Sequence, residues 1–333
     1  MRRALPLLLP LAGCDTVQSM TGGDGRQGAL FNDLFVIFAI VTLVMLALVL
    51  TGLIASIFRR HPAKSSVPGE NDEARDAPFR PLLIGWVALI ATGLLFLTTA
   101  TYLTDRAMQA RAPANRLLEI EITANQWWWD IRYKSSKPWQ TIRTANEIHL
   151  PVGIPARITL KSNDVIHSFW VPNLAGKQDL IPGRRTDTVL EPKRIGVYRS
   201  QCAEFCGAQH AHMALDVTVE SWADFNAWRV RQLTPAPAPA TPLALAGYNY
   251  VTTRECASCH AIAGTPASAQ VAPDLTHLAS RRSIAAGTFP MTRGHLYAWI
   301  ADPQGAKPGN NMPVVGLEPN ELHSVIAYLE TLK

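Results

Sequence analysis

The chain has 333 residues, which is enough for about two domains with separate hydrophobic cores. It is 48% hydrophobic and only 17% charged, below the roughly 25% of a typical soluble protein, so a wholly soluble protein is disfavoured. The net charge is +5, but the basic residues form no run interleaved with aromatic residues, which argues against nucleic acid as a partner.

Residues 1–13 are predicted to be a lipoprotein-type signal peptide. They combine two arginines, a short apolar run and small residues just before Cys14. A membrane span needs about 20 apolar residues, so this run is too short to cross a bilayer but suits an export signal. The ending Leu-Ala-Gly-Cys resembles the bacterial lipobox, which predicts that Cys14 is lipidated. The alternative is an ordinary signal sequence with an incidental cysteine.

Two long apolar stretches within residues 30–104 predict transmembrane helices over 34–58 and 82–103. The segment between them is rich in arginine and lysine, and such loops stay on the cytoplasmic side. Everything after the second stretch is therefore expected outside the cytoplasm. The prediction is a multi-pass protein of the bacterial inner membrane, in contact with the lipid bilayer, with its soluble domains on the periplasmic side.

Residues 115–232 are predicted to form an all-β domain. Short segments with alternating or β-branched character, such as 117–123, 156–162 and 214–220, are separated by turns rich in proline and glycine. Several short strands of this kind without a long helix are typical of a β-sandwich or a barrel.

Metal-binding side chains are concentrated in residues 201–213, QCAEFCGAQHAHM. Thiolate, imidazole and thioether ligands together select copper or zinc, and the thioether of Met213 argues against zinc. A mononuclear blue-copper site uses one cysteine, so Cys202 and Cys206 point instead to two copper ions bridged by two thiolates. For the cysteine pair taken alone, a disulfide or a zinc site is the alternative.

Two bridged copper ions would each need a histidine. His210 lies in the cysteine segment, and His167, in the segment Asn-Asp-Val-Ile-His-Ser-Phe-Trp between two predicted strands, is the candidate for the second. Ligands on two loops at one end of a rigid sandwich give a preorganised site.

The pattern Cys-x-Glu-x-Cys-Gly-x-x-His-x-x-Met, with Asp-Val-x-His-Ser-Phe and Pro-Gly-Arg upstream, resembles subunit II of the haem–copper cytochrome c oxidases. The resemblance covers about residues 30–232 and implies two transmembrane helices followed by a cupredoxin domain. It also implies a binuclear copper A centre, a magnesium ion at the interface with subunit I, and assembly with subunit I and other oxidase subunits. The residues that it places at copper A are His167, Cys202, Glu204 through its backbone carbonyl, Cys206, His210 and Met213, with the Glu204 side chain at magnesium.

The same resemblance makes Trp127, in the sequence Gln-Trp-Trp-Trp-Asp, the residue through which electrons enter. The alternative is that the three tryptophans form a core aromatic cluster. The chain departs from the family at the second transmembrane helix, where relatives often carry a glutamate near a proton-uptake path. Residues 78–86 contain no acid, so that route for protons is not implied here.

Residues 233–241 are predicted to be a linker. Their alternating proline and alanine favour polyproline II, which rises about 3.1 Å per residue and would reach roughly 25 Å. The tract is interpreted as a semi-rigid spacer between the copper domain and a second soluble domain at 242–333.

The second soluble domain carries Cys256-Ala-Ser-Cys259-His260, the pattern of covalent haem c attachment. The two thiols add to the haem vinyl groups and the histidine is the proximal iron ligand. With these assignments each of the five cysteines of the chain has a chemical role, so no structural disulfide is predicted.

The sixth iron ligand should be Met291 or Met312. Met312 is followed by proline on a turn-rich loop and resembles the axial methionine loop of class I cytochromes c, so it is preferred. Gly247 and Tyr250, facing Tyr328, resemble the helix crossing of that family. The last helix is predicted from apolar residues at helical spacing, namely Leu322, Val325, Ile326 and Leu329.

Taken together, the chain is predicted to be a two-helix transmembrane hairpin, then an all-β cupredoxin-like sandwich, then an all-α cytochrome c domain. This order resembles subunit II of the bacterial caa-type oxidases. The resemblance implies that a soluble or membrane cytochrome donates electrons to the haem, and that copper A passes them to subunit I for oxygen reduction. The alternative is a membrane-anchored electron carrier or copper-handling protein that acts without a catalytic oxidase subunit.

Overall fold

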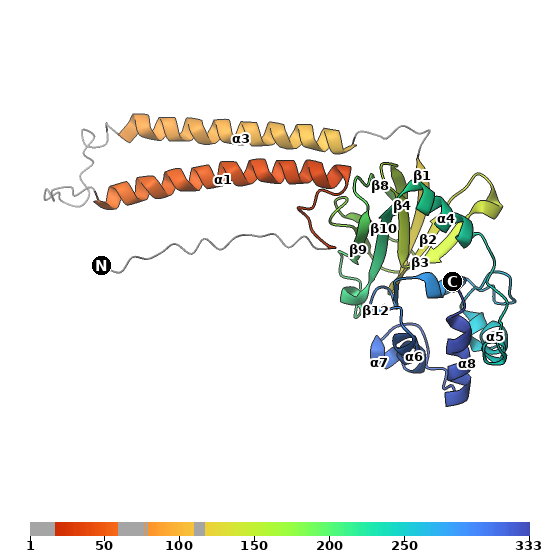
Figure 1. Ribbon diagram of the computed structural model, residues 1–333. Coiled ribbons are helices and arrows are strands. Elements are labelled where there is room, and N and C mark those ends of the chain that lie inside the picture. Colours follow the sequence, from red (N-terminus) through yellow and green to blue (C-terminus); the bar gives the residue numbers. More distant parts are fainter. Residues whose placement is uncertain (1–16, 59–76, 78, 110–116) are drawn as a thin grey trace, which may run out of the picture. The chain divides into compact units, whose positions relative to one another are not determined.

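The computed structural model describes residues 17–58, 77, 79–109 and 117–333 (Figure 1). Two apolar helices come first, then a β-sandwich and then a helical region, which confirms the predicted fold class. The chain divides into two compact units, Ala29–Arg111 and the remainder. The predicted signal peptide, the predicted lipidation site Cys14 and the basic segment 59–76 lie outside the described residues.

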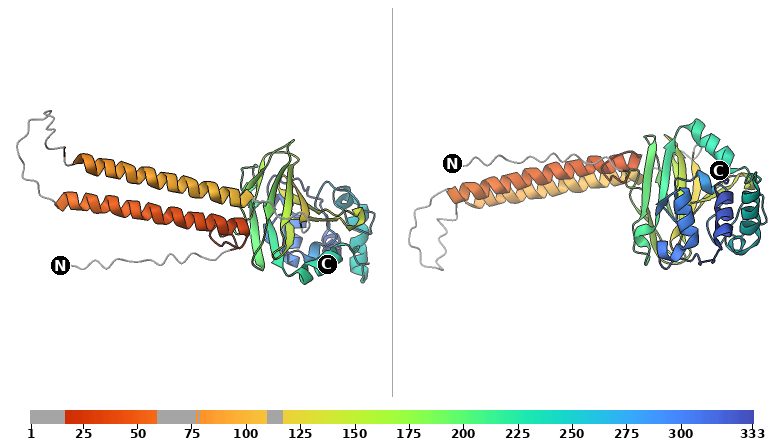
Figure 2. Two further views of the ribbon diagram at one scale, coloured as in Figure 1. Left: turned by 90° about the horizontal axis from the view of Figure 1, so that it is seen from above. Right: turned by 60° about the horizontal axis from the view of Figure 1, so that its bottom comes forward.

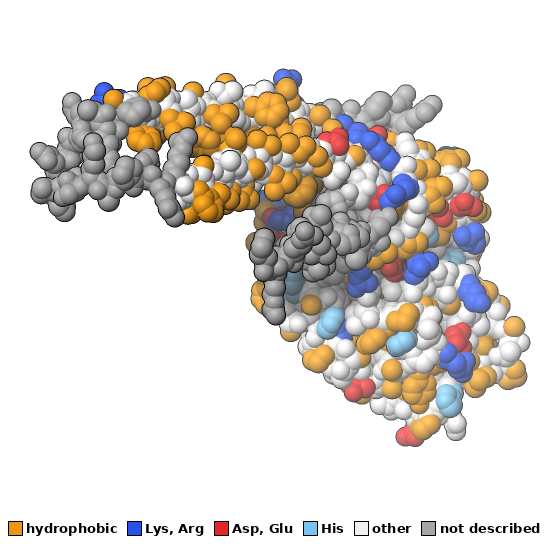
Figure 3. All heavy atoms as spheres, turned by 60° about the vertical axis from the view of Figure 1, so that its left-hand side comes forward, with side chains coloured by type: hydrophobic (Ala, Val, Ile, Leu, Met, Phe, Trp, Pro, Cys, Tyr) orange, Lys and Arg blue, Asp and Glu red, His pale blue; other side chains and the backbone are white. Residues whose placement is uncertain are grey.

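The two apolar helices are α1 (Arg26–Phe58) and α3 (Phe79–Gln109), and both are long and apolar enough to cross a membrane. Hydrophobic side chains run along both helices on the face shown in Figure 3. α1 begins before the predicted stretch 34–58, and α3 extends beyond both ends of the predicted stretch 82–103. The helical backbone continues into the polar residues that flank each apolar run.

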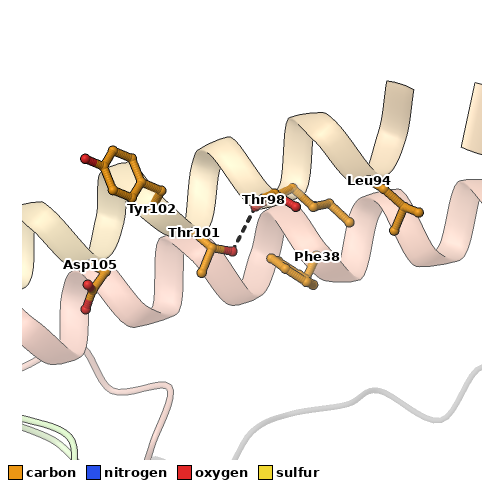
Figure 4. A pocket seen from close by; sticks show the side chains of 7 residues that line it. Phe38, Leu94, Thr98, Thr101, Tyr102 and Asp105 are labelled. Atoms are coloured by element: carbon orange, nitrogen blue, oxygen red, sulfur yellow. Dashed lines mark hydrogen bonds between the residues drawn. The ribbon is translucent and has the colours of Figure 1, made fainter. Parts of the chain in front are cut away.

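A shallow cavity of about 480 Å³ lies between α1 and α3 (Figure 4). Phe38 and Leu94 give it an apolar wall, and Asp105 lies at its polar end. The Thr101 hydroxyl donates to the carbonyl of Leu97 at 2.8 Å, so this polar group is satisfied within its own helix. The lining therefore becomes more polar toward the C-terminal end of α3.

The β-sandwich consists of two five-stranded sheets (Figures 1 and 2). One sheet has the order β3-β2-β1-β5-β8 and the other the order β4-β10-β9-β6-β7. The strands are β1 (Leu118–Asn125), β2 (Trp128–Tyr133), β3 (Ile142–Ala145), β4 (Glu147–Pro151), β5 (Ala156–Ser162), β6 (His167–Trp170), β7 (Gln178–Leu180), β8 (Thr186–Leu190), β9 (Gly196–Cys202) and β10 (Ala214–Glu220), followed by helix α4 (Trp222–Gln232).

The core of the sandwich follows from alternation along the strands. Successive side chains of a strand point to opposite faces, so β1 buries Ile120, Ile122 and Ala124 and turns the residues between them outward. Trp129 on β2 is fully buried in the same core. This packing holds both sheets rigidly and leaves the loops at one end free to carry ligands.

Residues 242–333, for which the sequence predicts a haem and which are called the haem domain below, contain four helices within the described residues. They are α5 (Pro242–Thr253), α6 (Arg293–Ala301), α7 (Pro303–Ala306) and α8 (Pro319–Leu329), together with a short hairpin of β11 (Ser283–Ile284) and β12 (Phe289–Pro290). Short 3-10 turns occur at Pro138–Gln140, His210–His212, Glu255–Ser258 and Leu278–Ser280. The Thr241 hydroxyl accepts from the Ala244 amide at 3.1 Å and so caps α5, with proline at the first helical position.

Helices α5 and α8 cross at Gly247, where the backbones approach closely (Figures 1 and 2). A Cβ atom at Gly247 would stand 1.9 Å from the carbonyl oxygen of Ser324. The aromatic ring packed edge-on against Tyr328 is that of Tyr248, at 5.4 Å between centroids, whereas Tyr250 lies under the guanidinium of Arg254. The apolar stripe predicted for the last helix is buried as expected.

Gly247→Ala is expected to destabilise the haem domain, because one added methyl would push α5 off α8. Overpacking a tight core contact costs about 1–3 kcal/mol, and the nearest atom here is backbone and cannot rotate away. Thermal unfolding followed at the haem absorption measures the change. Gly294→Ala on α6 is the matched control, because nothing lies within 4 Å of its added methyl. Equal stability of the two variants would contradict the close crossing.

The proline-alanine linker is attached to the haem domain at its start. The Ala236 amide donates to the carbonyl of Ala263 at 3.0 Å. The buried ring of His277 has its Nε2 atom 3.2 Å from the carbonyl oxygen of Thr234 and its Nδ1 atom 3.0 Å from that of Lys333. The first residues of the tract therefore contact the haem domain, and the semi-rigid spacer over residues 233–241 stays a prediction.

Candidate copper and haem centres

Strand pairing brings the two predicted copper loops together. β6 runs antiparallel to β9, with Phe169 opposite Cys202. His167 at the start of β6 therefore lies beside Cys202 at the end of β9, although 35 residues separate them in the chain. The ring of His167 is fully buried, and both cysteines are at most 3% exposed.

The other four predicted copper ligands lie beside the sulfur atoms of Cys202 and Cys206. Cys202 Sγ lies 3.9 Å from His167 Nδ1 and 3.3 Å from the carbonyl oxygen of Glu204. Cys206 Sγ lies 3.6 Å from His210 Nδ1 and 3.9 Å from Met213 Sδ. Each sulfur thus has one imidazole and one weaker donor beside it. His212 is exposed, and its Nδ1 atom lies 2.8 Å from Gln209 Oε1.

The two thiols are spaced for a shared metal ion. Their Sγ atoms are 3.8 Å apart, far beyond the ~2.04 Å of a disulfide bond. Metal–thiolate bonds are about 2.3 Å long, so an ion between the sulfurs can reach both. Hydrogen bonding with Cys206 lowers the pKa of Cys202 to about 3, so the pair readily loses its first proton. Because the thiolate is the ligating form, this donor set fits copper.

Asp164 orients His167, a role that the ligand pattern alone does not reveal. Its Oδ1 atom lies 2.7 Å from His167 Nε2, which leaves Nδ1 turned toward the thiol of Cys202. Burial disfavours the charged imidazole, but the hydrogen bond to Asp164 outweighs it and raises the pKa of His167. Carboxylates behind ligating histidines in this way fix the ring and strengthen the ligand.

Asp164→Asn is expected to weaken copper retention by about 10- to 100-fold, as losses of such outer-shell carboxylates do. The amide has no negative charge with which to strengthen the His167 imidazole as a ligand, and the ring loses the hydrogen bond that fixes its orientation. Competition with a copper chelator measures the change. Asn163→Ala on the same loop is the control, because its side chain bonds to Asn125 and not to a ligand. If both variants hold copper as the parent chain does, Asp164 has no such role.

The side chain of Glu204 is paired with an ammonium group. Lys177 Nζ lies 2.6 Å from Glu204 Oε1 and 2.9 Å from Asp179 Oδ1, and all three side chains are partly exposed. Magnesium prefers an octahedral set of oxygen ligands, and a carboxylate already neutralised by lysine does not provide one. The predicted magnesium site therefore has no support in this arrangement.

Trp127 contacts the copper loop directly. Its Nε1 atom donates to the carbonyl of Cys206 at 2.9 Å, and the Gln126 side chain donates to the same oxygen at 2.7 Å. Trp129 behaves differently, since it is fully buried and packs edge-on against Phe169. Trp129 is thus a residue of the sandwich core, whereas Trp127 packs against the copper loop.

The haem attachment residues line a cavity of about 510 Å³, within the usual size of a ligand pocket. Cys256, Cys259 and His260 lie on one wall of it. His260 Nδ1 lies 2.7 Å from the carbonyl oxygen of Pro273, which can only accept, so Nδ1 carries the proton and Nε2 is available to a metal. Burial lowers the pKa of His260, which keeps the ring neutral as an iron ligand must be.

The two methionine candidates differ in position. Met312 lines the cavity, whereas Met291 packs against the hydrophobic core and does not belong to the described lining. The loop that carries Met312 is fixed by Gln304, whose Nε2 atom donates to the carbonyls of Asn310 and Met312 at 2.8 and 2.9 Å. The cavity and its attachment residues fit a haem, and His260 and Met312 are the lining residues that would hold its iron.

Residues of the copper domain complete the wall of the same cavity. Gln126, Trp127, Trp128 and Asn146 all line it. A Cβ atom at Gly309, on the loop before Met312, would stand 3.8 Å from the Trp127 ring. Trp127 therefore lies between the haem cavity and the carbonyl of Cys206.

Comparison with known proteins matches both soluble parts of the chain. The sequence profile described as "Cytochrome C oxidase subunit II, periplasmic domain" matches residues 135–221, and the profile described as "Cytochrome c" matches residues 244–333. Cytochrome c oxidase subunit 2 of Alkalihalophilus pseudofirmus is 29% identical, over 99% of this chain and 97% of its own length. The protein of that name from Bacillus sp. (strain PS3) is 30% identical, over 76% of this chain and 74% of its own length.

Among solved structures, the chain is similar to the periplasmic domain of subunit II of a cytochrome oxidase of Bradyrhizobium japonicum. The two are 29% identical with a TM-score of 0.32, over 34% of this chain and 91% of that one.

Proposed function

Since the chain belongs to the cytochrome c oxidase subunit 2 family and carries a cytochrome c domain, we propose that it relays electrons from a cytochrome donor to subunit I. Two apolar helices and the matched periplasmic domain describe a membrane-anchored protein with an extracytoplasmic part. In the proposal both helices cross the inner membrane of a bacterium, and the donor is a soluble or membrane cytochrome. Subunit I reduces oxygen to water.

The copper A centre of the proposal is held by the two sulfurs with their neighbours. Its ligands would be His167, Cys202, the Glu204 carbonyl, Cys206, His210 and Met213, and the closeness of these groups to the two sulfurs supports the set. When bound there, a pair of copper ions would take up and release one electron. The residues themselves supply a dry and rigid cage, since the ligating side chains from β6 and β9 are buried in the sandwich core. A preformed cage keeps ligand rearrangement small.

In the proposal, Cys256 and Cys259 would attach a haem c covalently, and His260 and Met312 would be the ligands of its iron. A histidine and methionine pair raises the potential of a haem. The carbonyl of Pro273 fixes the His260 ring, and Gln304 holds the Met312 loop. Both ligands are thus positioned by the backbone around the cavity.

The observation that carries the proposal is the position of Trp127. Its ring lines the haem cavity while its Nε1 atom donates to the carbonyl of Cys206, a proposed copper ligand. The two candidate centres therefore have Trp127 in common, which supports a relay between them. A protein that merely stored copper would have no need of a haem cavity against its copper loop.

Purification of the full-length chain from its native membrane tests the proposal. We expect a multi-helix subunit with an a-type or related haem to co-purify, and reduction of the haem c by a cytochrome to be followed by oxygen consumption. A chain that purifies alone, holds both cofactors and never transfers electrons to an oxidase subunit would instead support an independent electron carrier. Copper bound and exchanged without electron transfer would support a copper-handling protein.

A further inference from the structure

Lys307 is a buried lysine at the junction of the copper and haem domains. It is 2% exposed, and it precedes the Pro-Gly turn of the Met312 loop. Its ammonium group donates to three backbone carbonyls, those of Trp127 at 3.0 Å, His212 at 2.8 Å and Ala285 at 3.0 Å. The three N–H donors of an ammonium group are therefore all matched.

The three acceptors belong to both domains. Trp127 and His212 lie on the two loops of the copper domain that flank the copper site, and Ala285 lies in the β-hairpin turn of the haem domain. Lys307 itself comes from the haem domain. One side chain thus ties the Met312 loop and the hairpin of the haem domain to the loops that carry Trp127 and the copper ligands.

Docking of the domains removes the Lys307 ammonium group from water, and its three hydrogen bonds offset the cost of that burial. Burial lowers the pKa of Lys307 to about 7, and in the described part of the chain no carboxylate forms an ion pair with it. A buried charge is tolerated only when its hydrogen bonds are satisfied. Two of the three acceptors are lost if the domains separate, so the side chain is specific to the docked arrangement.

Further contacts follow the same junction. Gln209 Nε2 donates to the carbonyl of Pro308 at 2.7 Å, and the amide of Ala214 donates to the carbonyl of Ala286 at 2.9 Å. The Arg281 side chain of the haem domain lies 3.7 Å from Glu147 of the copper domain, and both are buried. The contact between the domains is therefore specific and includes backbone hydrogen bonds.

We propose that Lys307 is a positioning residue that holds the haem domain in one register on the copper domain, with the haem cavity kept against Trp127. Electron transfer between the domains then takes place within a fixed assembly and needs no search by a tethered haem domain. This inference rests on the proposed function for its electron-transfer consequence, but the docking that it describes can be measured independently.

Hydrogen exchange of the Ala214 amide tests the docking in the full-length, cofactor-loaded protein. This amide is bonded across the junction, whereas the nearby amide of Asp216 donates to Asn146 within the copper domain. We expect Ala214 to be protected in the parent chain. In Lys307→Met its exchange should quicken by about tenfold or more, because hydrogen bonds to a charged group are strong, while Asp216 should not change.

Electron transfer from haem to copper, followed after rapid reduction of the haem, is the second measurement. We expect the Lys307→Met rate to fall by about tenfold and to become dependent on solvent viscosity, as movement of a domain becomes limiting. Lys307→Gln keeps two N–H donors, so its electron-transfer rate should lie between those of the parent chain and Lys307→Met. Lys137→Met removes the same side chain from an exposed position and is the matched control.

The outcomes separate the two proposals. Rapid exchange of Ala214 in the parent chain, or unchanged exchange and unchanged transfer in Lys307→Met, would overturn the role of Lys307. If Lys307→Met does not fold, Lys307→Gln gives the comparison instead, and exchange of Ala214 as slow as in the parent together with an unchanged transfer rate would overturn the role of Lys307. A parent chain that lacks copper or haem would overturn the proposed function, and the Ala214 measurement would continue to test the docking.

Discussion

Replacing both Cys202 and Cys206 by serine is expected to remove all copper from the chain and to abolish electron transfer from the haem. A serine hydroxyl is a hard, protonated donor at neutral pH, and it cannot bridge copper ions as a thiolate does. Cys202 Sγ also lies beside the His167 imidazole, and Cys206 Sγ lies beside the His210 imidazole and the Met213 thioether. We expect copper per chain to fall from two to none, as metal analysis of the purified protein would show.

Two controls make this result interpretable. The haem absorption should be unchanged, because Cys256 and Cys259 are on the other domain. His212→Ala should retain both copper ions, because that ring is exposed and bonded to Gln209. Full copper content in the double serine variant would contradict the assignment, and loss of copper in His212→Ala would show that the wrong histidine is assigned.

Replacing Met312 by alanine is expected to lower the reduction potential of the haem and to slow its oxidation by the copper centre. Axial ligands set haem potentials over roughly 0.8 V, so loss of the thioether should lower the value by on the order of 0.1–0.3 V. Met312 lines the cavity on a loop that Gln304 holds in place. A redox titration of the haem absorption measures the shift.

Met291→Ala is the matched control for this variant. Met291 packs against the core of the same domain without lining the cavity, so its truncation should affect stability and leave the potential nearly unchanged. A large fall in potential for Met291→Ala, with none for Met312→Ala, would show that Met291 and not Met312 is the iron ligand.

Much of the copper site could be predicted because its ligands are chemically unusual. Two cysteines, a histidine and a methionine within thirteen residues have few explanations besides a soft metal, and the pairing of β6 with β9 brings in His167. The order of the domains could be predicted for similar reasons. Apolar stretches, alternating strands and a haem attachment motif each have a strong local pattern.

The supporting residues could not be predicted in the same way. Asp164 is one of many acids in turns, and only the fold shows that its carboxylate reaches His167. Lys307, between alanine and proline in a loop rich in glycine, has the sequence context of an exposed lysine. Its burial depends on the contact of two domains, which local patterns do not describe. The attachment of the linker, through His277 and Ala263, likewise depends on tertiary contacts that local patterns do not describe.

The copper and haem content of the purified full-length chain tests the central claim most directly. The account predicts two copper ions and one covalently bound haem per chain, and the absorption spectrum should show both centres. A chain with zinc, with one copper ion or without covalent haem would contradict a relay from the cavity at His260 through Trp127 to the paired thiolates.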